Sequence, residues 1–418
     1  MSPPLAFLHL TTFYPPYSFG GDGVYVEALA RLLADAGHSV DVVHCVDAYR
    51  LLHPAAPPLP ARSHPGVTVH ALRSGGGALS PLLTHATGAP GLKRARIREV
   101  MTRRRWDVVH FHNISLLGPG VLTLMPACPD TVTLYTAHEH WLVCPTHTLW
   151  KFNRRPCERA TCLPCIALAG RPPQLWRYTG LLERACAGVD RFVAPSRAVA
   201  ALHAARGFSP PMARLPNFAA RADADWRHPP PPAHPRPYFL YVGRLEVLKG
   251  VQALVEAWRS ITEWDLVVAG GGTLEASLAR AAAGNPRVRL LGAVPPERLG
   301  PLYAHALACI VPSLGHEVFP LVVLEALSRK VPVVARDFGA LGEVASESGG
   351  ALLFRDDGEL KAALARLASS PALRAELGER GYRTYDERWS PEAHLRGYLA
   401  LIEDVARDKR LAASGAAP

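Results

Sequence analysis

Two glutamates eight residues apart, Glu317 and Glu325, mark the stretch of this sequence with the clearest chemical character. Phe319 and Pro320 lie between them, and Pro320 suits the first turn of a predicted helix over 321–328, where a missing N–H costs nothing. The unpaired amides at such a helix start attract an anion, above all a phosphate. Two carboxylates beside an anion make better sense as acceptors for neutral hydroxyl groups. A phosphate site flanked by hydroxyl-binding groups suggests a nucleotide-sugar.

Two cations in one predicted strand-to-helix loop supply the charge that a diphosphate requires. A strand over 238–242 ends at Gly243, Arg244 follows directly, and Lys249 opens the next helix. Side chains of one such loop converge where a diphosphate would lie. The plain structural alternatives are two solvated cations and an amphipathic helix with surface acids, and the combination of both segments argues against them.

The glutamate pair, the Phe-Pro between its members and the Gly-Arg-Leu…Lys-Gly pattern over 243–250 together resemble the signature of the family 4 glycosyltransferases (the glycogen-synthase-like "glycosyl transferases group 1"). Members of this family are retaining enzymes of the GT-B fold. The resemblance implies that Arg244 and Lys249 grip the diphosphate of a sugar donor. It also implies that Glu317 holds hydroxyls of the donor sugar and that Glu325 holds the ribose.

Further parts of the chain match the family's donor site. The loop over 20–23 resembles a Gly-Gly loop that reaches across the cleft toward the donor phosphates, although a plain glycine turn is an alternative. His138 follows a predicted strand over 131–135 and matches a histidine that contacts the donor sugar near the reacting carbon. The predicted catalytic residues are His138, Arg244, Lys249 and Glu317. The predicted donor-binding residues are Gly21, Gly243, Arg244, Lys249, Val294, Glu317, Phe319, Pro320, Leu321 and Glu325.

The sequence departs from the family pattern at two positions after the glutamate pair. Lys330 stands where a glycine is usual between helix and strand, and Ala340 replaces the second glycine of a Gly-Gly pair. The second change is expected to narrow the space near the donor.

Strands and helices alternate along most of the chain, which is typical of parallel sheets covered on both faces. The 418 residues are enough for two domains of about 150–200 residues each. With the resemblance, this predicts an α/β protein of the GT-B class: two Rossmann-like, doubly wound domains facing across a cleft, with a C-terminal helix that crosses back to the first domain. The predicted division is an acceptor-side domain over 1–218, a linker over 219–237, a nucleotide-sugar domain over 238–388, the crossing helix over 389–409 and a tail over 410–418.

Four cysteines gather in a segment over 141–168 that shows little apolar periodicity. Their spacing, C-x12-C-x4-C-x2-C, would allow four thiolates to hold a tetrahedral zinc ion and order the segment. Ordinary reduced thiols are the alternative, because only one Cys-x2-Cys pair is present. The tentative zinc ligands are Cys144, Cys157, Cys162 and Cys165, and no cofactor is expected to be required for catalysis.

A predicted helix over 92–105 carries seven cations and one acid, on a chain with a formal net charge of +10. It is either a solvated face or a contact with anionic lipid headgroups. Nucleic acid is not an expected partner, because aromatic residues do not interleave the cations. No apolar run approaches the roughly 18–20 residues of a membrane span. We therefore expect a cytoplasmic protein, with a peripheral contact on the inner face of the membrane as one possibility.

These observations predict an enzyme that transfers a sugar from a UDP- or GDP-sugar to a hydroxyl of a glycan or lipid-linked acceptor, with retention of configuration. Retention and the acceptor class follow from the resemblance alone. Two alternatives stay open: a GT-B epimerase or hydrolase of nucleotide-sugars, and an inactive scaffold whose metal-stapled segment binds a partner.

Overall fold

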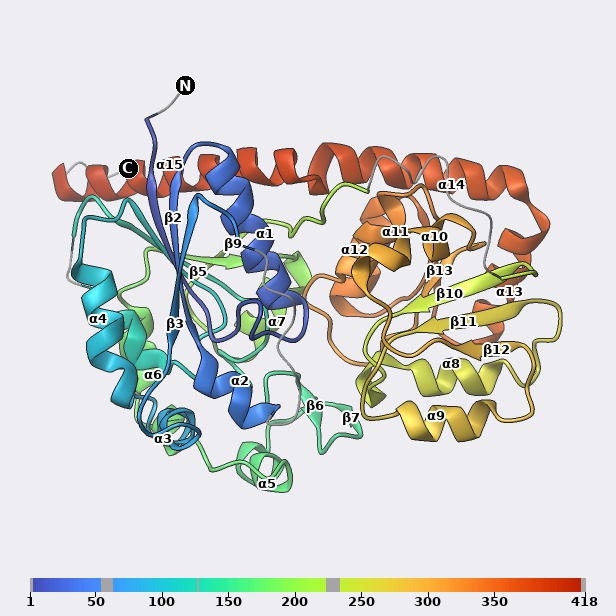
Figure 1. Cartoon of the computed structure of the whole chain (residues 1–418), viewed down its shortest axis with the longest axis horizontal. Coiled ribbons are helices and arrows are strands. Elements are labelled where there is room, and N and C mark those ends of the chain that lie inside the picture. The colour runs from blue at the N-terminus through green and yellow to red at the C-terminus, as the bar shows by residue number, and fades with distance from the viewer. Residues whose placement is uncertain (1–2, 54–62, 126–127, 223–233, 415–418) are drawn as a thin grey trace.

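A doubly wound parallel sheet forms the centre of the first domain in the computed structural model (Figure 1), which describes residues 3–53, 63–125, 128–222 and 234–414. Its strand order is β3-β2-β1-β4-β5-β8-β9. The order reverses direction between β1 and β4, so the carboxyl ends of these strands open a crevice, as in dinucleotide-binding folds. The strands are β1 Ala6–Leu10, β2 Ser39–Cys45, β3 Val67–Leu72, β4 Val108–Phe111, β5 Val132–Thr136, β8 Arg191–Ala194 and β9 Met212–Arg214.

A second parallel sheet, of the order β12-β11-β10-β13-β14-β15, forms the centre of the other domain. Its central strands are apolar runs buried on both faces, as expected where helices cover a parallel sheet from both sides. The strands are β10 Tyr238–Val242, β11 Asp265–Ala269, β12 Val288–Leu290, β13 Cys309–Val311, β14 Val333–Arg336 and β15 Ala351–Phe354. The predicted fold class is confirmed.

Helices pack on both faces of each sheet (Figure 1). Those of the first domain are α1 Gly21–Asp35, α2 Val46–Leu52, α3 Leu79–Thr87, α4 Arg94–Thr102, α5 Cys162–Leu168, α6 Leu181–Cys186 and α7 Arg197–Ala205, with short 3-10 turns η1 Gly91–Lys93, η2 Pro119–Thr123 and η3 Leu175–Tyr178. Those of the second are α8 Val251–Ala257, α9 Glu275–Ala282, α10 Leu299–Ala304, α11 Leu321–Leu327, α12 Gly339–Ser348, α13 Asp357–Ser369 and α14 Pro371–Thr384, with 3-10 turns η5 Val247–Lys249 and η6 Pro296–Arg298.

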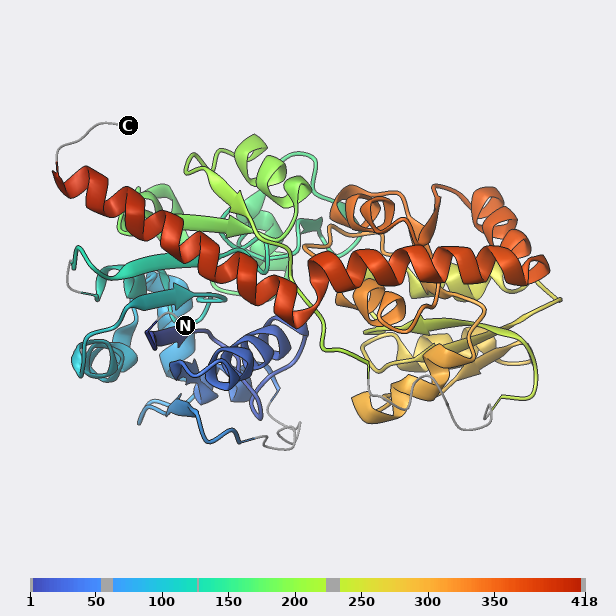
Figure 2. The same cartoon turned by 90° about the horizontal axis from the view of Figure 1, so that it is seen from above.

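The C-terminal helix α15, Pro391–Ser414, crosses back over the first domain. Figure 2 shows it leaving the second domain from α14 and running along the first. The π-helical turn η7, Tyr385–Trp389, makes the junction, at a place where an extra residue per turn bends the helix. Lys409 Nζ donates to Thr131 O and Asp190 Oδ2, which fixes the far end of α15 to the first domain. The helix continues to Ser414, past its predicted bound at residue 409.

Gly180, which adopts a left-handed conformation, separates η3 from α6. One sequence-based helix bound is wrong. The helix predicted over 92–105 ends at Thr102 and is preceded by η1. The predicted linker over 219–237 lies mostly outside the described residues.

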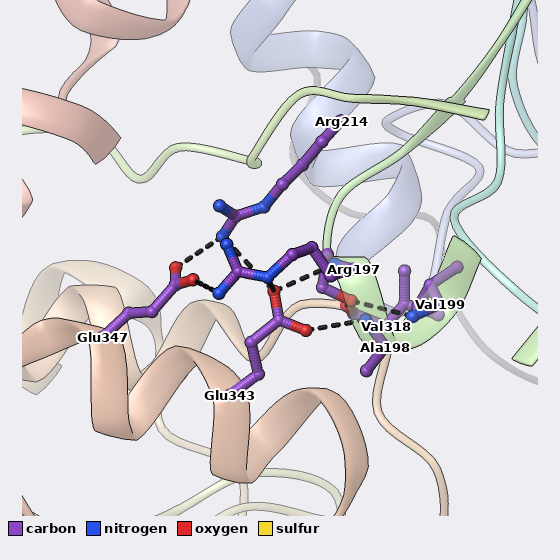
Figure 3. A network of polar contacts seen from close by, with 8 residues as sticks. Arg197, Ala198, Val199, Arg214, Val318, Glu343 and Glu347 are labelled. Carbon is purple, nitrogen blue, oxygen red and sulfur yellow. Dashed lines mark hydrogen bonds and ion pairs between the residues drawn. The ribbon is translucent and has the colours of Figure 1, made fainter. Parts of the chain in front are cut away.

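A polar network joins the two domains beside the cleft (Figure 3). Glu343, on α12 of the second domain, accepts hydrogen bonds from the backbone N–H groups of Arg197 and Ala198 at 2.9 and 2.7 Å, where α7 of the first domain begins. Arg197 and Arg214 also pair with Glu347. The carboxylate of one domain therefore caps a helix of the other, where the partial positive charge of the helix start favours it.

Candidate active site

A cavity of about 730 Å³ lies between the domains and receives side chains from both. It opens at the carboxyl ends of the two sheets, where doubly wound folds bind ligands. Nine of the residues predicted for the donor site line it: Gly21, His138, Gly243, Arg244, Lys249, Glu317, Phe319, Pro320 and Leu321. The structure therefore brings together most of a set that is spread over 300 positions of the sequence.

Gly250 sets the position of the loop that carries Lys249. Its φ of +71° is left-handed, and a Cβ there would lie 2.2 Å from the carbonyl oxygen of Pro312. Only glycine allows both the conformation and this close approach without strain. The contact brings the β10–α8 loop against the segment that follows β13, and this segment leads to Glu317.

Lys249 and Glu317 form an ion pair inside the cleft. Lys249 Nζ lies 2.7 Å from Glu317 Oε1, and Ser313 Oγ donates to the same oxygen at 2.6 Å. Burial acts to raise the pKa of Glu317, but the Lys249 ammonium and these hydrogen bonds outweigh it and hold the pKa below its ordinary value. The carboxylate is therefore ionised, and the lysine predicted to bind phosphate has an internal partner in this state.

Arg244 differs from Lys249 because its side chain is exposed and makes no hydrogen bond or ion pair to the described part of the chain. It lines the same cavity, beside the start of α11. Pro320 is the N-cap residue of this helix and not, as predicted, part of its first turn. A guanidinium and a helix start face the same space, and both favour an anion there.

The glycine loop of the first domain reaches across the cleft. α1 begins at Gly21, inside this loop. A Cβ on Gly21 would lie 3.4 Å from Leu321 Cδ1 of the second domain. The loop therefore meets the start of α11, as the resemblance implied, and a larger side chain at this position would push against α11.

Two of the predicted donor-binding residues, Val294 and Glu325, do not line the cavity. Glu325 Oε2 accepts a hydrogen bond from Tyr303 OH at 2.9 Å, and burial raises the pKa of the carboxyl despite this bond. A carboxylate has about four acceptor sites over its two oxygens, so the bond from Tyr303 leaves capacity for a ribose. The ribose role of Glu325 and the donor-binding role of Val294 stay predictions.

Asp22 and Asn113 also line the cavity, although no role was predicted for them from the sequence. Asp22 Oδ2 accepts from Asn113 Nδ2 at 2.9 Å. Burial, with the Glu139 carboxylate, raises the pKa of Asp22 to about 6 against the lowering effect of Asn113. An acid in the first helical turn is usually kept ionised by the helix dipole, so only its burial in three dimensions reveals this shift.

The four cysteines of the 141–168 segment lie near one another, but their sulfur atoms are not grouped around one point as the ligands of a zinc ion would be. Cys162 opens α5, beside the hairpin of β6 (Trp150–Lys151) and β7 (Arg155–Pro156), and the other three thiols add to burial in raising its pKa. Among the described residues, no three of these sulfurs lie within 4.8 Å of one another. The segment also has its own apolar anchors, since Trp141 and Leu149 are buried in contrast to the expectation.

A structural zinc ion at these cysteines stays a prediction. Elemental analysis of protein purified without a metal-affinity tag is expected to find about one zinc per chain, and chelation to lower the melting temperature. Replacing Cys186, a buried cysteine outside the segment, by alanine is the matched control and should leave the zinc content unchanged. Four freely titrating thiols without metal would leave these residues as ordinary reduced cysteines.

The basic stretch is not one solvated helix face. Lys93 is buried and donates through Nζ to two hydroxyl groups of α3, at 3.1 and 2.8 Å. Arg103 and Arg104 pair with Asp41, which is also buried. Among the described residues, no helix combines the length and apolar character that a membrane crossing requires. The cations that stay exposed on α4 are Arg94, Arg96 and Arg98.

Two facing doubly wound domains, a cationic cleft between them and a C-terminal helix that crosses back define a glycosyltransferase of the GT-B class. The structure superposes on a sucrose-phosphate synthase of Thermosynechococcus elongatus with a TM-score of 0.72, at 20% identity, over 96% of this chain and 99% of the other. It superposes on an Anabaena protein, HepE, solved with UDP and glucose, with a TM-score of 0.65 at 14% identity, over 96% and 100% of the chains.

The chain belongs to the family 4 glycosyltransferases. The family model "Glycosyltransferase Family 4" matches residues 19–222, and "Glycosyl transferases group 1" matches residues 236–370. A glycogen synthase of Mycobacterium tuberculosis is 29% identical over 422 aligned positions, which cover 93% of this chain and 92% of the relative.

Proposed function

We propose that this glycosyltransferase moves a sugar from a UDP- or GDP-sugar to a hydroxyl group of a glycan or lipid-linked acceptor, with retention of the anomeric configuration. The observation that carries the proposal is the convergence of Arg244, Lys249 and the start of α11 on one side of a cavity whose other side is formed by the first domain. The name of the glycogen synthase relative supports a role in polysaccharide synthesis, and the UDP-bound neighbour supports a uridine nucleotide.

Charge development on the leaving group explains the placement of the cations. As the anomeric C–O bond breaks, the nucleoside diphosphate gains negative charge, and groups already aimed at it stabilise the transition state. Arg244 and Lys249 supply two positive charges, and the amides at the start of α11 supply hydrogen-bond donors. Fixed cations of this kind allow transfer without a divalent metal ion.

The Lys249–Glu317 ion pair implies an exchange of partners when the donor binds. A diphosphate draws the ammonium toward itself, which leaves the Glu317 carboxylate free to accept hydroxyl groups of the donor sugar. Glu325, outside the cavity, holds the ribose through its second oxygen after a small movement. His138 contacts the sugar from the first domain.

Incubation with a panel of nucleotide-sugars, with and without oligosaccharide acceptors, tests the proposal. A glycosylated product of retained configuration is the expected result, and release of nucleotide should depend on the acceptor. Release of nucleotide or of an epimerised sugar without any acceptor would instead identify a hydrolase or an epimerase. If the protein neither turns over a nucleotide-sugar nor binds a nucleotide, the inactive-scaffold alternative would be favoured.

Asp22 is expected to bind the incoming acceptor hydroxyl as an ionised hydrogen-bond acceptor. Because its pKa is raised to about 6, the carboxyl gains a proton as the pH falls through 6. We expect kcat/KM for the acceptor to fall about tenfold per pH unit below 6. Asp22→Asn should be about tenfold slower at pH 8 and lack this acidic limb. Donor affinity, measured at the same pH values, is the control, and an identical limb in Asp22→Asn would contradict the assignment.

We expect the exposed arginines of α4 to contact anionic lipid. Each cation near an anionic leaflet contributes about 1 kcal/mol, so sedimentation with vesicles should rise with anionic lipid and fall with salt. Replacing Arg94 and Arg98 by glutamine should lower recovery about tenfold or more. Arg374→Gln, on the second domain, is the control, and equal recovery with neutral and anionic vesicles would contradict the contact.

A further inference from the structure

Three histidines from adjacent strands of the first domain form a hydrogen-bonded row that ends at the cavity. His9 lies on β1, His112 follows β4 and His138 follows β5. His9 Nδ1 lies 2.9 Å from His112 Nε2, and His112 Nδ1 lies 3.0 Å from His138 Nε2. His9 and His112 are fully buried, whereas His138 lines the cavity. The row therefore connects the interior of the sheet with the site.

The protons in this row can be arranged in only two ways. Burial lowers the pKa of His9 and of His138 to about 3, and that of His112 well below its ordinary value. All three rings are therefore neutral at physiological pH, and each has one N–H donor and one acceptor nitrogen. His112 uses both of its nitrogens in the row, so it donates to one neighbour and accepts from the other. The two arrangements run in opposite directions.

The buried end of the row decides between them. His9 Nε2 is buried and has no hydrogen-bond partner among the described residues. If each histidine donated to the next in the direction from His138 to His9, His9 Nε2 would carry a proton with no acceptor. If each donates in the direction from His9 to His138, His9 Nε2 carries only an unused lone pair. Buried N–H groups without an acceptor are rare, whereas under-used acceptors are tolerated more often, so the second direction is favoured.

We propose that His9 and His112 are positioning residues that fix His138 in the tautomer with its proton on Nδ1, so that His138 presents an N–H donor to an oxygen of the donor sugar. Nδ1 makes no hydrogen bond to the described protein and is not a buried unpaired atom, which leaves it open to the cavity. The identity of the sugar oxygen rests on the proposed function. The tautomer itself does not.

A second set of contacts fixes the plane of the His138 ring. The ring of Tyr25 packs on it with centroids 4.6 Å apart, and Tyr25 OH lies 2.9 Å from His394 Nε2. His394 Nδ1 lies 2.8 Å from the carbonyl oxygen of Pro216, which can only accept, so His394 donates from Nδ1 and Tyr25 donates to Nε2. Since His394 belongs to α15, the crossing helix holds one side of the ring while the histidine row holds the other.

His110 lies next to these histidines but is not hydrogen-bonded to any member of the row. Its two nitrogens lie 2.8 Å from Tyr398 OH and from Thr136 Oγ1. Although its ligand atoms and those of His9 and His112 lie within 4.8 Å of one another, hydrogen bonds already use both nitrogens of His110 and both nitrogens of His112. Thr136→Val is therefore a matched control: it perturbs the same buried cluster and leaves the row intact.

Two-bond ¹H–¹⁵N spectra of histidine-labelled protein test the tautomer directly, because they distinguish a protonated ring nitrogen from an unprotonated one. We expect His138 to carry its proton on Nδ1 in the wild type and in Thr136→Val. A proton on His138 Nε2 in the wild type would overturn the proposal. This measurement needs no substrate, so its result stands whether or not sugar transfer is found.

Variants at His112 test the consequence for the site. The amide of His112→Asn can still donate to His138 Nε2, whereas His112→Leu cannot. We expect His112→Leu to give mixed tautomers at His138 and about a tenfold loss of kcat/KM for the nucleotide-sugar, with unchanged affinity for the free nucleotide. His112→Asn should recover most of the loss. An unchanged tautomer in His112→Leu, or an equal loss in both variants, would overturn the positioning role.

Discussion

Replacing Lys249 by alanine is expected to lower kcat about 10²–10³-fold, which is the usual effect of removing one preorganised donor from a developing anion. Lys249 lines the cavity from a loop that Gly250 fixes against Pro312. The variant also leaves the Glu317 carboxylate inside the cleft without its ammonium partner. Removing one partner of a buried pair costs about 3–5 kcal/mol, so some of the loss could come from reduced stability.

The double variant Lys249→Ala/Glu317→Gln separates the two effects. It removes the unpaired charge, so the melting temperature should return toward that of the wild type while kcat stays low. Lys361→Ala, an exposed lysine of α13, is the control for the loss of a charge and should leave both quantities unchanged. Near-wild-type kcat in folded Lys249→Ala would contradict a role for this lysine in stabilising the leaving diphosphate.

The sequence predicted well which residues of the second domain line the cleft, because they lie in short local segments. The loop with Arg244 and Lys249 and the stretch from Glu317 to Leu321 each occupy a few consecutive residues at the end of one strand, and a parallel sheet brings such ends together. The ion pair between Lys249 and Glu317 joins positions 68 apart. It depends on the close approach at Gly250, which the sequence pattern alone does not reveal.

The missed features are contacts between distant elements. The raised pKa of Asp22 arises from burial by neighbouring segments, and the capture of Glu325 by Tyr303 arises from the packing of α10 against α11. The histidine row likewise needs the strand order β1-β4-β5, because His9 and His112 are 103 positions apart in the chain and His112 and His138 are 26 apart. A lone histidine on a strand resembles any core residue until its neighbours are known.

Breaking the network of Figure 3 is expected to open the cleft. Glu343 accepts from two backbone amides of the other domain and lies 3.3 Å from the Arg214 guanidinium, and its side chain is only 12% exposed. Hydrogen bonds to charged groups contribute about 1.5–3 kcal/mol each, so losing even one such contribution in Glu343→Gln/Glu347→Gln should shift the closure equilibrium about 10–150-fold. Scattering should report a larger radius of gyration.

The active site should respond to this opening because the network lies next to the segment that carries Glu317. Ser196 Oγ, which caps α7, also donates to the carbonyl oxygen of Val318 at 3.2 Å, directly beside Glu317. Opening should therefore separate the first domain from the segment with Glu317, which we propose holds the sugar, and KM for the nucleotide-sugar should rise about tenfold or more. Glu379→Gln, which breaks the Lys330–Glu379 pair within the second domain, is the control and should change neither quantity. An unchanged radius of gyration in the double variant would mean that contacts other than this network hold the domains together.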